Sequence, residues 1–534
     1  MKGRIVGIDL GTSNSCVAAV VNGEPVVIPD REGWKTQPSV VSFLPDGRTL
    51  VGRSAKNRLP IDPMNTIYSA KRLIGRPFYS PEVKVAASRY GYKIVHGSDD
   101  TAKIVVRDKE LAVEEIQALV LRHMKTIAEQ HLGEVVKRAI ITVPANFNEA
   151  QRQGTVLAGQ LAGLDVERVL NEPTAAALAY GSANNKRERI AVYDFGGGTF
   201  DITVLELRDH VFEVRSTAGD SFLGGDDFDF RIVDLIVSSF QERFNFDIRT
   251  DRAAMQRLKA LAEQAKIDVS EQGSAVARIA ELVPGAAAAS EFDFRLDAQM
   301  IRQRCADLVQ QTFGVCDEAL KLARISSSEI DRVVLVGGST KSPLVREMAK
   351  AYFFKEPFDA INPDEVIAVG AAIYGRGLDH VAYPSVNIPG GIPGLTPLLL
   401  DVTPHALGIE TVGGIADSLI LRNSAIPTRS TRTFVTSRDE QETVRVNVLE
   451  GESRSASECR LLGVLTLTGL RRARRGQVAV EVTFEVKADG MLHVRARDKQ
   501  TGRHTQTILR VAGVMSDESR DAARSRDLPA SADR

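Results

Sequence analysis

The chain contains two copies of one short arrangement, an apolar strand that ends in an aspartate and runs into a turn of glycines and hydroxyl residues. Ile5–Asp9 leads into Gly11–Ser13, and Ile190–Asp194 leads into Gly196–Thr199. A third turn, Gly337–Thr340, follows another apolar strand without an aspartate. Glycines let backbone N–H groups approach an anion, and turns rich in such groups bind phosphate. One such turn is usually only a tight connection, but the set of three predicts a nucleotide triphosphate clamped between two lobes.

The two aspartates, Asp9 and Asp194, fall at the ends of their strands. Mg²⁺ prefers carboxylate oxygens and keeps several of its waters. We therefore expect these two side chains to hold Mg²⁺ through water.

Length, charge and cysteine content limit the classes of protein to which this chain can belong. A chain of 534 residues is too long for one core, so two or three domains are expected. A net charge of −1 gives no electrostatic case for nucleic-acid or membrane binding. The four cysteines are scattered, which argues against a disulfide framework, and Cys305 and Cys316 share an apolar helical face typical of core packing. No long apolar segment and no signal-peptide pattern is present, so a cytoplasmic protein is expected.

Residues 1–380 alternate strands and helices, which predicts a mixed α/β region of two related lobes with a cleft between them. The expected strands include 138–143 and 200–205. The expected helices are 114–131, 148–162, 252–269 and 299–323.

Residues 381–402 are predicted to be a linker, because prolines and glycines crowd 383–397. The linker ends in Leu398-Leu399-Leu400-Asp401. Three adjacent leucines have no place in a solvated linker, so we expect them to dock against the protein.

Residues 403–513 are predicted to form an antiparallel β-sandwich, since the strands alternate and Asp489-Gly490 is a hairpin signal. The basic run Arg471–Arg475 lies between two of these strands; a solvated loop is the favoured interpretation and an anionic partner the alternative. Residues 514–534 carry almost no large apolar side chains and are expected to be disordered.

Taken together, the sequence resembles the DnaK family, the seventy-kilodalton heat-shock chaperones, over most of its length. The resemblance rests on these segments, in this order: Gly7–Thr12, Lys71–Gly75, Ile141–Ala145, Asn171–Ala177, Val192–Asp201, Leu223–Asp229, Val336–Thr340, Leu398–Pro404 and Leu407–Thr411.

The resemblance implies an actin-like, two-lobed ATPase domain, a docking linker and a β-sandwich that grips extended peptides. ATP hydrolysis would switch affinity for apolar segments of unfolded proteins and so assist folding. The alternatives are a nucleotide-gated peptide-binding scaffold with little turnover, and a small-molecule kinase of the same architecture. The sandwich argues against the kinase.

The resemblance also implies catalytic roles. Lys71 would approach the γ-phosphate and the attacking water, and Glu172 would position that water. Without the resemblance, Lys71 would pass for a surface lysine and Glu172 for a helix N-terminal carboxylate. The residues implied in catalysis are Lys71, Glu172, Asp194 and Thr199. Those implied in holding Mg²⁺ and a monovalent cation, K⁺, are Asp9, Asp194 and Asp201.

The resemblance implies that a larger set of residues binds ATP or ADP. Glu263, Lys266 and Ser270 share one helical face and would contact the adenosine, although a solvated charged face is the default for such spacing. The full implied set is Gly11, Thr12, Ser13, Asn14, Gly196, Gly197, Gly198, Gly225, Glu263, Lys266, Ser270, Gly337, Gly338, Ser339, Lys341 and Asp364.

A peptide site and a coupling route are implied as well. The peptide site would comprise Ile409, Phe434, Val444 and Val446, which otherwise simply fill the sandwich core. The resemblance also implies a set of residues that transmit changes between the nucleotide site and the peptide site: Pro144, Arg152, Arg168, Asn171, Leu398, Leu399, Leu400 and Asp401.

The resemblance implies three kinds of partner: unfolded polypeptides, a J-domain cochaperone and a nucleotide exchange factor. The chain itself is expected to be a monomer.

Three departures from the family pattern change what is expected. No segment after the sandwich suits a helical lid, so fast peptide exchange is expected. The linker is long and Pro397 precedes the leucines, which predicts weaker coupling. Residues 271–297 diverge most, and this region often meets exchange factors.

Overall fold

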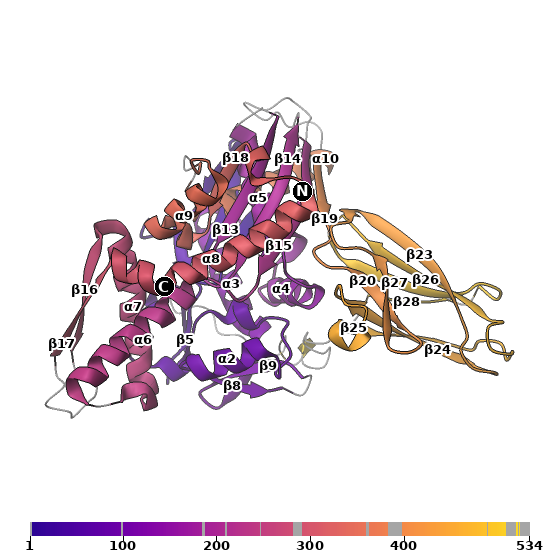
Figure 1. The fold of residues 1–534 in the computed structure, drawn as a ribbon, viewed down its shortest axis with the longest axis horizontal. Coiled ribbons are helices and arrows are strands. Elements are labelled where there is room, and N and C mark those ends of the chain that lie inside the picture. Colours follow the sequence, from indigo (N-terminus) through magenta and orange to yellow (C-terminus); the bar gives the residue numbers. More distant parts are fainter. Residues whose placement is uncertain are drawn as a thin grey trace.

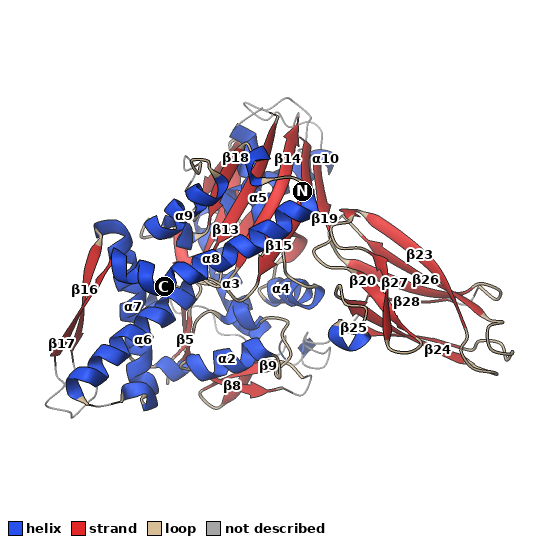
Figure 2. Ribbon diagram, viewed as in Figure 1, coloured by secondary structure: helices blue, strands red, loops and turns tan. Residues whose placement is uncertain are grey.

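The structure is a computed structural model that describes residues 3–97, 100–183, 187–208, 211–245, 247–280, 291–358, 362–382, 398–488, 490–502 and 504–508, with Arg520, Asp521 and Ala523. A mixed α/β region is followed by an all-strand part that projects from one side of it (Figures 1 and 2). None of the helices described reaches the length and apolarity that a membrane span needs.

The first large sheet has six strands in the order β12-β11-β1-β2-β3, with β4 paired to β2. Strand β1 pairs in parallel with β11 and antiparallel with β2. β11 is buried along its whole length, as expected for an inner strand covered on both faces. The strand bounds are β1 (Ile5–Asp9), β2 (Asn14–Val21), β3 (Glu24–Val27), β4 (Thr36–Pro38), β11 (Arg138–Val143) and β12 (Asp165–Asn171).

The second large sheet repeats this connectivity in the order β18-β13-β14-β15-β19-β22. Strand β13 pairs in parallel with β18 and antiparallel with β14, just as β1 pairs with β11 and β2. Each aspartate therefore lies near the end of a strand with the same neighbours in its own sheet. The strand bounds are β13 (Glu188–Phe195), β14 (Phe200–Arg208), β15 (Val211–Asp220), β18 (Arg332–Val336), β19 (Leu398–Val402) and β22 (Ala425–Ile426).

Helices pack around these sheets, and the four predicted from the sequence are confirmed as α3, α4, α7 and α8, with no end shifted by more than three residues. Side chains cap them as the sequence allows: Asn148 accepts from the N–H of Gln151 at α4, and Asp297 accepts from the N–H of Met300 at α8. Cys305 and Cys316 are fully buried on α8, which confirms core packing. The bounds are α1 (Arg53–Lys56), α2 (Pro81–Arg89), α3 (Val113–Leu132), α4 (Glu149–Leu161), α5 (Glu172–Ala183), α6 (Gly225–Phe244), α7 (Arg252–Gln272), α8 (Ala298–Ala323), α9 (Pro343–Phe353) and α10 (Val366–Ala382).

The α/β region also contains several shorter strands and turns. The hairpin of β16 and β17 lies beside α6 and α7, at the edge farthest from the all-strand part (Figure 1). Two short 3₁₀ turns, η2 (Ala70–Leu73) and η6 (Gly338–Lys341), carry candidate site residues. The remaining strands are β5 (Val41–Phe43), β6 (Thr49–Val51), β7 (Thr66–Ile67), β8 (Lys93–His96), β9 (Ala102–Val106), β10 (Lys109–Ala112), β16 (Ser274–Ala280) and β17 (Glu291–Asp297).

Two four-stranded antiparallel sheets, β21-β20-β24-β25 and β23-β26-β27-β28, surround one core cluster, as predicted for a sandwich, and Ala150 of α4 also contributes to that cluster. The predicted hairpin is confirmed too, since β26 and β27 pair up to Val486 opposite Leu492. The strand bounds are β20 (Leu407–Thr411), β21 (Ile415–Ile420), β23 (Thr428–Val435), β24 (Thr443–Glu450), β25 (Arg460–Thr468), β26 (Ala479–Val486), β27 (Leu492–Asp498) and β28 (His504–Ile508).

The leucine run forms strand β19, which adds in parallel to the edge of the second sheet. Leu398, Leu399 and Leu400 lie opposite Val211, Phe212 and Glu213 of β15. On its other side β19 pairs with β22, so one strand joins the α/β region to the sandwich segment. The leucines therefore dock, as predicted. Residues 383–397, including Pro397, lie outside the described residues, as does most of the predicted tail, of which Ala523 is buried against the first core.

Candidate functional site

The three glycine turns converge on one cavity of about 270 Å³ between the two large sheets, here termed the central cavity. The β1–β2 turn and the β13–β14 turn reach it from different sheets, and η6 and the starts of α5 and α6 complete its wall. Its predicted lining residues are Asp9, Gly11, Thr12, Ser13, Asn14, Lys71, Glu172, Asp194, Gly196, Gly197, Thr199, Gly225, Glu263, Lys266, Gly337, Gly338, Ser339, Lys341 and Asp364.

Three predicted residues lie just outside this lining. The carbonyl of Gly198 accepts a hydrogen bond from Arg72 Nε (3.0 Å). The Ser270 hydroxyl donates to the carbonyl of Lys266, one turn earlier on α7 (2.9 Å). Asp201 is buried on β14 opposite Asp194, and its Oδ1 accepts from the N–H of Asn146 (3.0 Å).

Several lining residues were missed by the sequence analysis, and a signal existed for some of them. Ile267 and Glu271 each follow a predicted residue of the α7 face by one position. Asp226 and Asp229 belong to the Leu223–Asp229 segment of the family resemblance, of which only Gly225 is predicted to bind the nucleotide. The other missed residues are Ser15, Thr36, Pro363 and Ile367.

A buried ion pair occupies the inner end of the cavity. Lys71 Nζ lies 2.6 Å from Glu172 Oε1, and the two side chains are only 2% and 7% exposed. Burial, followed by the charge of Glu172, raises the pKa of Asp9 to about 7 and that of Asp194 well above its usual range. Lys71 opposes both shifts but does not cancel them. The cluster has more carboxylates than cations, so it favours an additional positive charge.

The donor set at this point fits Mg²⁺. Asp194 Oδ2 is buried and has no hydrogen-bond partner among the described residues. Asp9 and Asp194 line the same cavity from two sheets, and carboxylates with room for water are the environment that Mg²⁺ takes. Among the described residues, no group of three or more His, Cys, Asp and Glu is placed to chelate a metal directly.

The two aspartate–glycine turns touch each other across the cavity. A Cβ placed on Gly197 would lie 1.9 Å from Ser13 Oγ, a distance that no real side chain tolerates. Gly337 has φ +83°, and its added Cβ would meet the Phe195 carbonyl at 2.5 Å. Glycine at these two positions therefore allows backbone of three turns to surround one small ligand group.

The outer end of the cavity is held by ion pairs between α7 and its neighbours. Lys56 of α1 lies 2.7 Å from Glu263, and Lys266 lies 2.6 Å from Asp229 on α6. Burial alone would raise the pKa of Glu263, but Lys259, Lys56 and Lys266 outweigh burial and lower it. Glu263 thus faces the cavity as a carboxylate, with Lys266 beside it in the lining.

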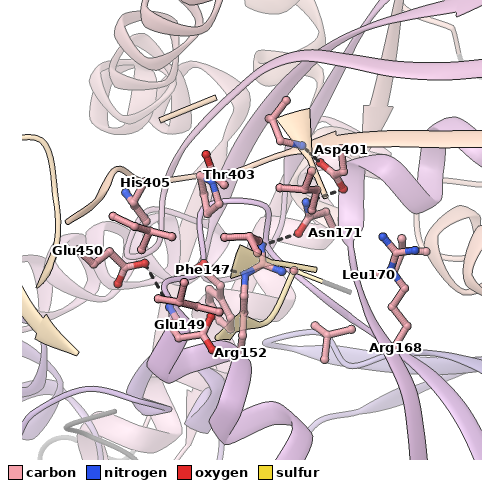
Figure 3. Close-up of a pocket in the computed structure, with 18 residues that line it drawn as sticks. Phe147, Glu149, Arg152, Arg168, Leu170, Asn171, Asp401, Thr403, His405 and Glu450 are labelled. Atoms are coloured by element: carbon pink, nitrogen blue, oxygen red, sulfur yellow. Dashed lines mark hydrogen bonds between the residues drawn. The ribbon is translucent and has the colours of Figure 1, made fainter. Parts of the chain in front are cut away.

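A second cavity of about 40 Å³ lies where the α/β region meets β19 and the sandwich, here termed the interface pocket (Figure 3). Arg152 Nη2 donates to Asn171 Oδ1 (2.6 Å), and Asn171 Nδ2 donates to Asp401 Oδ2 (3.0 Å). Arg168 lines the same pocket and bonds the Tyr374 hydroxyl. Of the predicted coupling residues, Arg152, Arg168, Asn171 and Asp401 meet here, whereas Pro144 is buried but does not line the pocket.

Two glutamates from opposite sides also meet at the interface pocket. The N–H of Glu149 on α4 donates to Glu450 Oε1 on β24 (3.4 Å), and Glu450 Oε2 is buried without a partner among the described residues. Burial is the main cause that raises the pKa of Glu149 to about 7, and Glu450 adds to it. Nearby, burial would lower the pKa of His405, but Glu452 and Glu450 outweigh it and raise it.

The four candidate peptide-binding residues divide into two pairs. Ile409 and Val446 are each 4% exposed and belong to the sandwich core. Phe434 and Val444 are half-buried at its edge.

We predict that docking of β19 and the sandwich weakens as the pH rises. Glu149 has a raised pKa in the docked state, so its neutral form favours docking and ionisation opposes it. The pKa of His405 is also raised in the docked state, so the protonated imidazole favours docking. That effect is lost as the pH rises through the pKa of the docked state. For Glu149 alone the loss between pH 5.5 and 8 is at most about 2 kcal/mol. The readout is amide hydrogen exchange in β19, corrected for the intrinsic pH dependence of exchange.

Glu149→Gln should flatten this profile, whereas Glu134→Gln, an exposed glutamate paired with Arg4, should leave it unchanged. A profile that is already flat in the natural sequence, or equally steep in Glu149→Gln, would contradict the assignment.

The comparison with known families adds to this geometry. A model of the Hsp70 protein family matches residues 5–531, which is nearly the whole chain and includes both cavities. Because the match covers far more than half of the sequence, the chain belongs to the Hsp70 family.

Proposed function

We propose that the chain is an ATP-dependent molecular chaperone of the DnaK type. Hsp70 proteins are ATPases with a chaperone role, and they generally bind ATP or ADP with Mg²⁺. The observation that carries the proposal is the central cavity, in which three glycine turns surround the buried Lys71–Glu172 pair. The docked strand β19 then connects that region to the sandwich.

The proposed division is an actin-like nucleotide-binding domain over 1–380, a linker over 381–402 and a substrate-binding domain over 403–513. The repeated connectivity of the two large sheets supports two lobes in the first domain. The core cluster of the sandwich, which among the described residues takes only Ala150 from outside 403–513, supports the third segment as a domain.

Hydrolysis requires alignment of water with the γ-phosphate and stabilisation of the spread charge. Lys71 is held by Glu172 at the inner end of the central cavity, where its ammonium group would stabilise that charge. Glu172 would orient the water, and the Thr199 hydroxyl lies in the same lining. Water-excluded surroundings strengthen each of these electrostatic interactions.

Asp9 and Asp194 would hold Mg²⁺ through water, and Asp201, buried behind them, would help Asp9 hold K⁺. Bound Mg²⁺ would neutralise phosphate charge during transfer. Burial, followed by the charge of Glu172, raises the pKa of all three aspartates, and bound cations would oppose both effects, which supports assigning cations here.

In the sandwich, Phe434 and Val444 are partly accessible and are the stronger pair of peptide-contact candidates. Ile409 and Val446 would be reached only if the sandwich opened. Client polypeptides, a J-domain cochaperone and a nucleotide exchange factor are the proposed partners. Four free cysteines suit a reducing compartment, and a cytoplasmic location stays a prediction.

The deciding experiment measures dissociation of a labelled apolar peptide with ATP and with ADP, together with phosphate release. A chaperone of this type releases peptide at different rates in the two nucleotides and hydrolyses ATP. A chain that binds peptide but produces no phosphate is the scaffold alternative, and one with identical release rates refutes the proposal.

Lys71→Ala should lower kcat for ATP hydrolysis by about a hundredfold or more, as expected when a preorganised charge is removed from a water-excluded site. Single-turnover phosphate release is the measurement. Lys350→Ala, which removes an exposed lysine paired with Glu356, is the matched control and should keep full turnover. Equal rates in the two variants would remove Lys71 from the mechanism.

Gly197→Ala should weaken ATP binding about tenfold or more, because the new methyl group overlaps Ser13 Oγ and forces the turns apart. In the double variant Gly197→Ala/Ser13→Gly the nearest atom is the Ser13 backbone nitrogen at 3.7 Å, so part of the affinity should return. Calorimetric titration with ATP measures both. Gly314→Ala, which meets nothing within 4 Å, is the control. Absence of any rescue would place the defect elsewhere.

Asp401→Ala should abolish most of the difference between peptide release in ATP and in ADP. The substitution leaves Asn171 Nδ2 without its acceptor and removes the carboxylate that anchors β19 beside Arg152. Asp417→Ala, which breaks only an exposed pair with Arg432, should preserve the difference. An unchanged ATP-to-ADP ratio in Asp401→Ala would show that coupling does not pass through this contact.

A further inference from the structure

The basic run Arg471–Arg475 is an exposed loop, as predicted, and backbone hydrogen bonds hold it in place. It lies between β25 and β26, and backbone hydrogen bonds fasten it to the loop between β23 and β24. The N–H of Glu440 donates to the carbonyl of Ala473 (2.7 Å), and the N–H of Gly476 donates to that of Thr436 (2.8 Å). Residues 436–442 and 469–477 together form one end of the sandwich, here termed the arginine tip.

The arginine tip adjoins the accessible half of the proposed peptide site. Phe434 is the next-to-last residue of β23 and Val444 the second of β24, so the 436–442 loop connects the two. Ala473, in the middle of the arginine run, packs against the sandwich core, as Phe434 and Val444 do. Because the 436–442 loop connects Phe434 to Val444 and is bonded to the arginine run, a peptide held at these two residues would have its flanking residues beside the arginines.

The tip carries unbalanced positive charge. Its five arginines face three acidic residues, and one of these, Glu442, is paired with Arg472. Asp439 accepts from the backbone N–H of Arg475 (2.7 Å). The side chains of Arg438, Arg474 and Arg475 are exposed and have no ion pair with any residue that the structure describes. Three guanidinium groups are thus available to a ligand.

We propose that the arginine tip selects client segments in which acidic residues flank the apolar ones. The inference rests on the proposed peptide-binding function and names the substrate class of that site. Arginine forks bind carboxylates in planar, bidentate geometry, and several such contacts at the rim of a site add selectivity more than raw affinity. The whole chain has a net charge of −1, which favours an acidic polypeptide over nucleic acid as the ligand.

The tip lies at the opposite end of the sandwich from the interface pocket. Strand β26 begins at Ala479, directly after the tip, and ends at Val486, which lines the interface pocket. An eight-residue strand spans roughly 25 Å. Substitutions in the tip can therefore be tested without touching the contacts that hold β19.

The test uses the full chain in ADP and three fluorescent peptides with one apolar centre and acidic, neutral or lysine flanks. The acid-flanked peptide should bind roughly three- to tenfold more tightly than the lysine-flanked one at low salt, and the gap should shrink at high salt. Arg438→Gln/Arg474→Gln/Arg475→Gln should abolish the preference. Arg429→Gln/Arg495→Gln/Arg497→Gln removes the same charge from the outer face of the second sandwich sheet and should retain it.

Equal affinity for the acidic and lysine flanks, or a preference that survives the tip variant, would overturn the proposal. So would displacement of the peptide by a single-stranded oligonucleotide in the natural sequence but not in the tip variant, since the tip would then be a nucleic-acid site. The neutral peptide separates this inference from the function itself. If that peptide binds in a nucleotide-dependent way while flanks have no effect, only the client preference fails; if no peptide binds, the proposed function fails with it.

Discussion

The parallel pairing of β19 with β15 is the contact on which the arrangement of the molecule depends. It extends the second sheet by a strand from beyond the linker, and β22 of the sandwich segment extends it once more. Backbone hydrogen bonds of this kind require neither large apolar area nor particular side chains, so a short strand can be added and removed reversibly. The neighbouring polar contacts then decide whether it stays.

Those polar contacts begin at the central cavity itself. Glu172 holds Lys71 inside that cavity, while the preceding residue, Asn171, holds Asp401 of β19. A second route runs through Asn146, whose N–H donates to Asp201 and whose carbonyl accepts from His405 (3.3 Å). Adjacent backbone groups thus face the central cavity on one side and the interface pocket on the other. A change at either of them could therefore shift the docking of β19.

Much of the fold could be predicted from the sequence, because local rules decide it: apolar runs and glycine turns predict the strands, the helices and the three turns that line the central cavity. The rest of the predicted cavity lining, including Lys71, Glu172 and the α7 face, was implied by the family resemblance and not by local rules. The interface pocket could not be predicted in the same way. Leu398–Leu400 predict docking, yet only tertiary structure selects the β15 edge, and the meeting of Glu149 with Glu450 joins residues far apart in the chain. The arginine run is an exposed loop, as the sequence predicts, but its hydrogen bonds to 436–442 are visible only in the tertiary structure.

The composition of the interface pocket explains why the docked arrangement can be reversible. Glu149, Arg152 and Asp401 are all buried there, and charges removed from water recover their lost hydration only in part. A large apolar interface would hold the two parts together firmly. In this interface the attraction between polar and charged side chains is opposed by the cost of removing them from water. A docking equilibrium close to balance would be shifted by a few kcal/mol, which is the scale of a change in charge or hydrogen bonding at a neighbouring site. Since Asn171 and Glu172 lie between the interface pocket and the central cavity, a rearrangement around Lys71 need move only one peptide unit to alter the hold on Asp401.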